Sequence, residues 1–340
     1  MKQKGFFDEE DCLKKLSILG DPLEKLNEFI DWEDFRGLLV MRLKKESQGP
    51  GGRPPFDYVM MFKILILQKL NNIADDKTEY LINDRLSFRR FLNLQLYDTV
   101  PDAKTIWHFR EELKTANIME ELFQLFTTKL ENEKVITYSG SIVDASFVEV
   151  PKQRNNREEN KDIAEGKVPK KWKYKKNRNK LVQKDIDARW ATKNKQRHYG
   201  YKDHIKIDKK SKIITKYRVT SAEVHDSQEL KNLIDKKKDK RLYGDSAYTG
   251  EEVQKCIPKN ILNRIHEKGY KNRPLTKMQK RENTAKSQIR ARVEHAFGAM
   301  THFGGLMIRT IGLARAEIQV GLSNFTYNLT RYAYLMGAKA

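Results

Sequence analysis

The pattern of apolar residues changes once along the chain, at Val135, and this change limits the folds that are open to it. Before that point, apolar residues recur every three or four positions over residues 8–134, as in amphipathic helices. After it, residues 136–150 are rich in β-branched and aromatic side chains, which favours a strand. We therefore predict a helical N-terminal domain over residues 1–134 and a sheet-containing domain over residues 135–340.

The helical part contains several clear signals. Residues 51–55, Gly-Gly-Arg-Pro-Pro, break the chain, and Tyr58–Leu67 is apolar on nearly all faces, which predicts a helix at the centre of a bundle. Acids at Asp75 and Asp76 favour a helix start, and Asp102 is a suitable cap for another helix. Either the bundle is purely structural or it contains a helix-turn-helix that binds a DNA groove.

Four arginines of this part are candidates either for phosphate contacts or for a solvated face: Arg85, Arg89, Arg90 and Arg110. Periodicity does not separate these two interpretations.

Strands and helices alternate after Val135. Residues 201–208 and 212–220 alternate polar and apolar positions around a short polar turn, which predicts an antiparallel hairpin. The remaining predicted elements are a helix over 226–234, a strand that ends at Asp245, a helix over 250–256, a strand over 260–265 and a long helix over 276–300. This order predicts a mixed α/β fold, in which a mixed β-sheet is flanked by helices.

Two strands and the long helix each supply one acid. Asp144 follows an apolar pair in its strand, and Asp245 ends a short apolar strand, so neighbouring strands would bring the two together. Glu294 lies beside the apolar stripe of the helix, and Arg290, four residues earlier, is on the same face. Simpler interpretations exist as well, because Asp245 suits a helix cap and Glu294 suits a surface ion pair with Arg290.

The charge of the chain indicates what such acids act on. Lys and Arg number 67 against 46 Asp and Glu, which gives a formal net charge of +21. This excess favours a polyanionic partner, nucleic acid before an anionic membrane, because no apolar run is long enough to span a bilayer. No signal peptide is recognisable, so we expect a cytoplasmic protein, with Cys12 and Cys256 as ordinary reduced thiols.

Three carboxylates in a basic protein suit a hard divalent cation. Mg²⁺ and Mn²⁺ prefer oxygen ligands and keep coordination positions for water and phosphate. Two such ions, about 3.5 to 4 Å apart, can assist both oxygens of an in-line phosphoryl displacement. Asp144, Asp245 and Glu294 therefore predict metal-dependent phosphodiester chemistry on nucleic acid.

Residues 151–200 form a basic insert in the sheet domain. They hold 17 Lys or Arg and 6 Asp or Glu, a net charge of 17 − 6 = +11. Cations and aromatics together are typical of segments that grip phosphates and stack on bases, although a disordered, solvated loop has the same composition. The candidate nucleic-acid-binding residues of the insert are Lys171, Trp172, Lys173, Tyr174, Lys175, Lys176 and Arg178.

Four blocks of the sequence resemble a known family. The blocks are Ile142–Ser146 (IVDAS), Tyr199–His204 (YGYKDH), Tyr243–Tyr248 (YGDSAY) and Arg292–Gly298 (RVEHAFG). They are similar to the signature blocks of the DDE transposases of the IS5 group, within the IS4/IS5-like superfamily of bacterial insertion sequences. The helical part agrees, through residues 52–55 (GRPP), 86–89 (LSFR) and 101–110 (PDAKTIWHFR), and the resemblance covers nearly the whole chain.

This resemblance implies an RNase H-like catalytic domain in which Asp144, Asp245 and Glu294 form the metal-binding triad. It implies an enzyme that cuts at transposon ends with water and joins the liberated 3′ hydroxyl to target DNA. The implied cofactors are Mg²⁺ or Mn²⁺, two ions per site. The implied partners are double-stranded DNA and further copies of the chain, as a homodimer or higher oligomer on DNA, in the bacterial cytoplasm at the nucleoid.

One departure from the pattern concerns the last block. The IS4-type pattern places a Tyr and a Lys where Ser287 and Thr301 stand, so only Arg290 and Glu294 carry over, with Arg290 as a DNA contact. Lys202 and His204 are further candidate phosphate contacts, unless they are ordinary strand surface. Two other functions stay open: a stand-alone nuclease and a catalytically inactive DNA-binding regulator.

Overall fold

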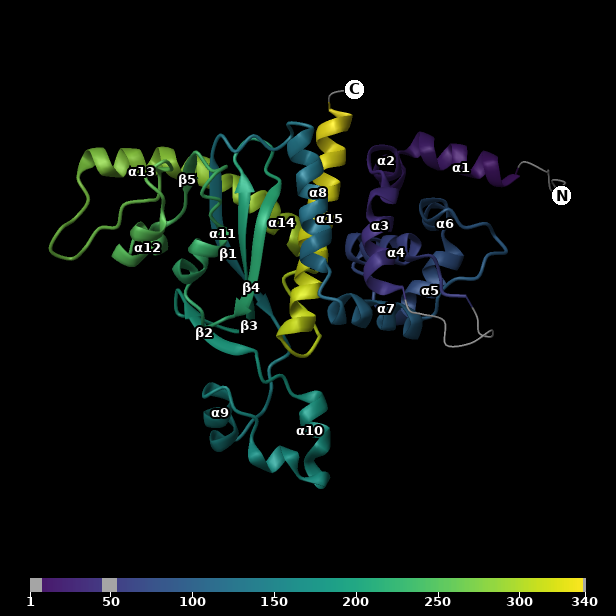
Figure 1. Ribbon diagram of the computed structural model, residues 1–340, viewed down its shortest axis with the longest axis horizontal. Helices are drawn as coiled ribbons and strands as arrows, with labels where there is room; N and C mark the ends of the chain where they lie inside the picture. Colours follow the sequence, from purple (N-terminus) through teal and green to yellow (C-terminus); the bar gives the residue numbers. More distant parts are fainter. Residues whose placement is uncertain (1–7, 45–53, 339–340) are drawn as a thin grey trace. The chain divides into compact units, whose positions relative to one another are not determined.

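The chain divides into two compact units. A computed structural model describes residues 8–44 and 54–338 (Figure 1). The first unit contains the residues up to Leu125 and those from Phe325 onward, and the second is Phe126–Asn324. The division thus falls before the predicted boundary at residue 134, and the end of the chain belongs to the helical unit.

The described part of the first unit is helical. Its elements are α1 (Asp8–Leu19), α2 (Pro22–Phe29), η1 (Trp32–Phe35), α3 (Arg36–Leu43), α4 (Tyr58–Asn71), α5 (Asp75–Asp84), α6 (Leu86–Leu92), α7 (Ala103–Thr115), the start of α8 (Met119–Asn132) and the end of α15 (Leu313–Gly337). As predicted, α4 is buried on nearly all sides, and its Phe62 packs edge-on against Phe325, with ring centroids 5.4 Å apart. Asp102 caps α7 by accepting a hydrogen bond from the Thr105 amide at 2.7 Å.

The predicted break at residues 51–55 lies only partly within the described residues, because residues 51–53 are outside them. In the part of the chain that the structure describes, no helix has both the length and the apolar character to cross a membrane. Cys12 and Cys256 are both free, exposed thiols.

Most of the candidate DNA-binding arginines stabilise the helical unit itself. Arg89 is buried and donates hydrogen bonds within its own region. Arg90 forms an ion pair with Asp21 and Arg110 forms one with Asp75, each at 2.6 Å. Of these four arginines only Arg85 is exposed. The structural interpretation therefore holds for Arg89, Arg90 and Arg110.

The second unit is built around a six-stranded sheet. Its strands are β1 (Ser141–Glu149), β2 (Arg189–Lys193), β3 (Gln196–Asp208), β4 (Ile214–Ser221), β5 (Arg241–Tyr243) and β6 (Leu262–Asn263). The order is β2-β3-β1-β5-β6, with β4 also paired to β3. Strand β1 is antiparallel to β3 and parallel to β5, so the predicted mixed sheet is confirmed. Strand β2 was not predicted, because it lies within the basic insert.

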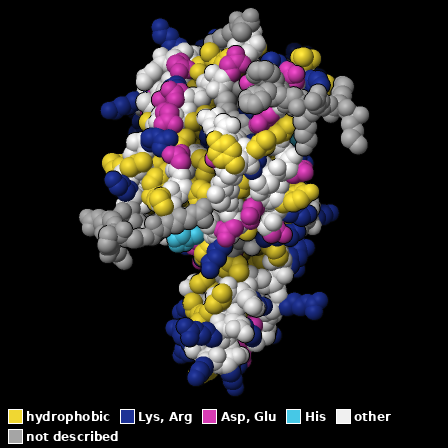
Figure 2. Space-filling model, turned by 90° about the vertical axis from the view of Figure 1, so that its right-hand side faces the viewer, with side chains coloured by type: hydrophobic (Ala, Val, Ile, Leu, Met, Phe, Trp, Pro, Cys, Tyr) yellow, Lys and Arg dark blue, Asp and Glu magenta, His cyan; other side chains and the backbone are white. Residues whose placement is uncertain are grey.

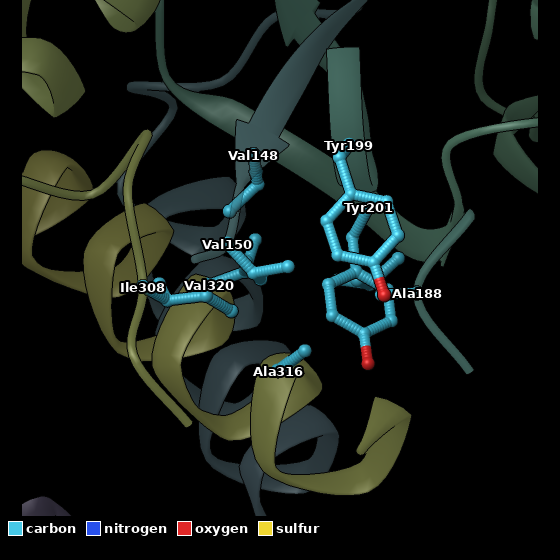
Figure 3. Close-up of a cluster of buried hydrophobic side chains, with 9 residues drawn as sticks. Val148, Val150, Ala188, Tyr199, Tyr201, Ile308, Ala316 and Val320 are labelled. Carbon is cyan, nitrogen blue, oxygen red and sulfur yellow. The ribbon is translucent and has the colours of Figure 1, made fainter. Parts of the chain in front are cut away.

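Helices of the second unit cover both faces of the sheet, and others form the basic insert. Those of the insert are α9 (Arg157–Ala164), η2 (Lys170–Lys173), η3 (Lys175–Asn177) and α10 (Arg178–Gln183). The others are η4 (Asp226–Glu229), α11 (Leu230–Leu233), η5 (Ser246–Tyr248), α12 (Glu251–Cys256), α13 (Lys277–Arg290), η6 (Ala291–Val293), α14 (Glu294–His302) and the start of α15. Val148 packs with Val320 of α15 on one face (Figure 3), whereas Val143 packs with Leu230 of α11. Successive strand side chains point to opposite faces, so the sheet lies between these helices.

The basic insert is a folded lobe with its own small core. Trp172 is fully buried and its indole nitrogen donates to Glu159 at 2.6 Å, while Lys180 binds the same carboxylate oxygen at 2.7 Å. The prediction that Trp172 stacks on bases is therefore wrong, because its ring supports the lobe instead. Tyr174 remains exposed, and Figure 2 shows Lys and Arg side chains around this lobe.

One acid lies deep in the second unit without a charge partner. Asp203 of β3 is fully buried, and the Asn324 side-chain amide donates to its Oδ1 at 3.2 Å. Its Oδ2 has no hydrogen-bond partner among the described residues. Burial raises the pKa of Asp203 to about 8, with the Asn324 hydrogen bond opposing this shift.

The pH dependence of stability should reveal this acid. Folded Asp203 keeps its proton up to about pH 8, whereas an unfolded Asp loses it near pH ~3.9, so the free energy of unfolding should fall as pH rises between these values. The slope from this group is at most about 1.4 kcal/mol per pH unit. Urea unfolding between pH 5 and pH 8 measures it. Asp203→Asn should remove this component, whereas the same slope in wild type and variant would contradict the assignment.

Candidate active site

The register of two parallel strands places Asp144 beside Asp245. Ser141 of β1 lies opposite Leu242 of β5, an offset of 242 − 141 = 101 residues. Asp144 and Asp245 differ by the same offset, 245 − 144 = 101. The pairing that begins at the start of β1 therefore brings the two carboxylates to the same level of the sheet. This confirms that the two acid-bearing strands are neighbours.

Close packing around Gly244 supports this approach of the two strands. A Cβ at Gly244 would lie 3.1 Å from the Tyr248 ring and 3.2 Å from a methyl group of Val143. A larger residue would therefore push the end of β5 away from β1. The glycine just before Asp245 keeps the two acids close.

Asp245 also caps the turn that follows it. Its Oδ1 accepts a hydrogen bond from the Ala247 amide at 2.9 Å, at the start of η5. The capping interpretation is thus correct, and it is compatible with a role in the site, because the second carboxylate oxygen is not used by the cap. The hydrogen bond fixes the side chain in one orientation.

Asp144 is a buried carboxylate that already binds one cation. Asp144 is only 7% exposed, and Arg290 Nη1 lies 2.6 Å from its Oδ2. Burial raises the pKa of Asp144 to about 6, Arg290 opposes this shift, and the negative charge of Asp245 adds to it. The effect of the Asp245 charge on Asp144 indicates that this place favours an added positive charge.

The predicted long helix is interrupted next to the third acid. Helix α13 ends at Arg290, a single turn η6 follows, and α14 begins at Glu294, whose side chain is exposed. Within the described residues, no group of three His, Cys, Asp or Glu lies close enough to hold a metal ion. The structure therefore brings Asp144, Asp245 and Arg290 together. Glu294 does not join the two aspartates. Arg290 binds Asp144, so it does not form the simple surface pair with Glu294.

Lys202 and His204 have internal partners and are not exposed phosphate contacts. Lys202 Nζ lies 2.8 Å from Asp226 Oδ1 and donates to the Val224 carbonyl at 2.7 Å. His204 is fully buried, with Nε2 2.8 Å from the Thr220 hydroxyl, and burial lowers its pKa to about 4. The prediction of phosphate contacts is wrong for both, because β4 and the turn after it cover this part of β3.

Several residues near the two acids were not singled out from the sequence. The Tyr248 hydroxyl is buried without a hydrogen-bond partner among the described residues, and its pKa is raised by burial and by Asp144, Asp226 and Asp245. Burial lowers the pKa of His266. The positive charge of Arg290 lowers it further, and the negative charge of Asp245 opposes the shift. Only Tyr248 had a usable signal, because it belongs to the same sequence block as Asp245.

The two strand acids suit a divalent cation. Both present carboxylate oxygens, the ligands that Mg²⁺ prefers, and their proximity raises the pKa of Asp144. Arg290 supplies the positive charge on one side of Asp144. Asp144 and Asp245 therefore fit as two ligands of such a cation. A third protein ligand would have to come from a residue that does not contact these two aspartates in the structure.

Two parts of the chain match known protein families. Residues 10–112 match a family described as a transposase domain (DUF772), and residues 136–329 match the family described as a transposase DDE domain. Among solved structures, a cryo-EM structure of a piggyBac transposase synaptic complex with hairpin DNA is similar over 94% of this chain and 76% of that chain. Its TM-score is 0.45 and its sequence identity is 11%.

Removing the Arg290 charge should affect Asp144 specifically. In Arg290→Gln the pKa of Asp144 should rise above its value of about 6, because burial then acts without the opposing cation. We expect a loss of about 1 to 3 kcal/mol in the free energy of unfolding at pH 8, and a smaller loss at pH 5, where Asp144 is protonated. Urea unfolding in metal-free buffer at both pH values measures this difference.

Arg292→Gln is the matched control, because Arg292 is exposed, two residues away, and donates to the Lys209 carbonyl. Equal losses for the two variants at both pH values would show that the Asp144 ion pair has no special role.

Proposed function

Because the chain belongs to the family of transposase DDE domains, we propose that Asp144, Asp245 and Glu294 form the catalytic triad of this DNA transposase. The matched register of Asp144 and Asp245 carries the proposal. It places two acids from sequence-distant strands at one level of the sheet, inside the region that matches the family.

Divalent metal ions are general cofactors of this family, and we propose Mg²⁺ or Mn²⁺ here, two ions per site. Asp144 and Asp245 would hold them through their carboxylate oxygens. Such ions, when bound, activate the attacking oxygen and stabilise the leaving oxygen in phosphoryl transfer. Glu294 would complete the set by a rotation within η6, the single turn that separates it from Arg290.

Arg290 has the properties of a phosphate contact. Its Nη1 binds Asp144, while its Nε is buried with no hydrogen-bond partner among the described residues. A guanidinium group binds phosphate oxygens through two parallel N–H groups. We propose that Arg290 would donate to a phosphate of the DNA in place of Asp144.

The proposed reaction has two steps at the same residues. Water attacks a phosphodiester at the transposon end, and the bond to the 3′ oxygen breaks to leave a 3′ hydroxyl. This hydroxyl then attacks a target phosphodiester, so one phosphate ester bond forms as another breaks. The acids of the triad hold the reacting groups in line, and Arg290 orients the phosphate.

The proposed partners are double-stranded DNA, as transposon ends and as target, and further copies of the chain, as a homodimer or higher oligomer. Nucleoid association in the bacterial cytoplasm would follow from DNA binding. Exposed residues of the basic lobe suit contacts with the DNA backbone: Lys171, Lys173, Tyr174, Lys175, Lys176 and Arg178. Lys171 also forms an exposed ion pair with Glu158 at 2.9 Å, which salt and phosphate can replace.

The exposed position of Glu294 favours one alternative function, a catalytically inactive DNA-binding regulator. In such a protein the two strand acids would be structural and no DNA would be cut.

Asp245→Asn separates the two functions. The amide keeps an oxygen that can accept the Ala247 hydrogen bond, so the turn should fold normally. We expect cleavage and joining to fall by about a thousandfold or more, because a neutral amide binds divalent cations poorly. The purified protein, Mg²⁺, DNA that carries the ends of its own element and a target plasmid provide the assay, with gel-shift binding measured alongside.

Glu252→Gln is the control, because Glu252 is an exposed acid on α12. Cleavage that is absent from the wild type would support the regulator, whereas full activity in Asp245→Asn would contradict the catalytic role of Asp245. Cutting without any joined product would support a nuclease instead.

A further inference from the structure

The hairpin formed by β2 and the start of β3 is an unassigned surface next to the two acids. Lys193 of β2 pairs with Gln196 of β3, so the turn contains only Asn194 and Lys195. Both turn residues have positive φ, 51° and 66°. This is the geometry of a tight two-residue hairpin turn, which holds the end of β2 in a defined place.

A glycine allows the hairpin to extend beyond β1. Gly200 has φ +145°, and a Cβ there would lie 2.3 Å from the Val148 carbonyl oxygen. Any larger residue would therefore separate β3 from β1. Beyond this point β3 pairs with β2, and the hairpin continues past the end of β1.

The hairpin carries positive charge and an exposed aromatic ring. Residues 189–197 contain four Lys or Arg and no Asp or Glu. Trp190 is 42% exposed, with the Arg197 guanidinium 4.9 Å and Lys152 Nζ 5.8 Å from its ring centroid. In contrast to Trp172, this ring is available at the surface. An exposed aromatic ring among cations is the composition of surfaces that bind a nucleic-acid strand.

Lys193 of the hairpin lies beside an acid of the neighbouring segment, Asp226. Its Nζ lies 4.0 Å from Asp226 Oδ2, and its side chain remains 47% exposed. The ammonium group of Lys193 is half exposed and its ion pair is long. It can therefore bind a phosphate in place of the carboxylate while it stays in contact with water, which keeps the desolvation cost small.

Asp226 is an acid near the pair that interior cations offset only from one side. Helix η4, which begins at Asp226, packs against η5, which follows Asp245. Arg290 binds Asp144, and Lys202 offsets the charge of Asp226 from the interior. Lys193 is the half-exposed cation beside Asp226, where a phosphodiester that approaches from solvent can reach it.

We propose that the β2–β3 hairpin holds the DNA strand that leads into the acid pair. Lys193 binds a backbone phosphate beside the one that reacts, and Trp190 stacks on an unpaired base of that strand. The role of Lys193 rests on the proposed transposase function, whereas strand binding by Trp190 does not require it.

The first experiment measures binding without activity. A short single-stranded oligodeoxynucleotide should quench the tryptophan fluorescence of the wild type. The control is Trp107→Phe, which removes an exposed tryptophan of the first unit and should be quenched as well. Trp190→Phe removes the fluorophore and should lose most of this quenching. Trp190→Ala removes the ring and should bind several-fold more weakly, since stacking on one aromatic residue contributes about tenfold or more to strand affinity. Unchanged quenching in Trp190→Phe together with unchanged affinity in Trp190→Ala would overturn the stacking role.

The second experiment measures DNA cleavage with Mg²⁺ under single-turnover conditions. Lys193→Gln should slow cleavage by about tenfold or more while end binding changes by less than about threefold, and Lys193→Arg should restore part of the rate. Lys259→Gln removes the same charge outside the hairpin, where the side chain is exposed and has no ion pair within the described part of the chain, and it should cleave within about twofold of the wild type.

Equal rates for the two Gln variants would overturn the role of Lys193, because a general loss of charge would then explain the result. Cleavage that is absent from the wild type would instead refute the proposed function. In that case the fluorescence experiment alone decides whether the hairpin binds a strand.

Discussion

The parallel pairing of β1 with β5 is the constraint on which the candidate site depends. The two strands meet at the centre of the sheet, and their register gives Asp144 and Asp245 the same offset as the paired residues before them. Tight packing at Gly244 keeps the strands together. Because Asp144 is buried, the repulsion between the two acids is only partly screened by water, and a cation must offset it.

Arg290 provides that cation in the structure, and it links the sheet to the helices that follow. Its ion pair with Asp144 fixes the end of α13 against β1. The turn η6 comes next, and Glu294 starts α14 with an exposed side chain. The third acid is therefore separated from the other two by one short turn, and a single arginine lies at the junction. The proposed catalytic arrangement involves this junction.

The large positive charge of the chain is divided between two uses. Arg90 and Arg110 form ion pairs within the helical unit, and Lys206 pairs with Asp239 in the interior of the second unit at 2.9 Å. These cations satisfy buried acids and are not available to DNA. The insert that follows β1 holds a net charge of +11 out of +21, and exposed Lys and Arg lie there on the basic lobe and on the β2–β3 hairpin. The net charge alone therefore overstates the surface that can bind a polyanion.

The class of the fold, most elements outside the insert and the pairing of the two acid-bearing strands could be predicted from the sequence alone. The all-apolar run in α4, the cap at Asp102 and the change of pattern at Val135 are local signals, and local backbone preferences fix their outcome. The blocks around Asp144 and Asp245 likewise identified the family, since each block is a short contiguous stretch.

Only the tertiary structure decided which polar side chains are accessible. Trp172, Lys202 and His204 have the composition of a nucleic-acid surface, yet other segments of the folded second unit bury each of them. Lys193 and Trp190 lie in a strand without its own periodic signal, which pairing with β3 creates. The ion pair of Arg290 with Asp144 joins residues 146 positions apart. Burial and ion pairing arise from such long-range contacts, and the spacing of residues along the chain does not encode them.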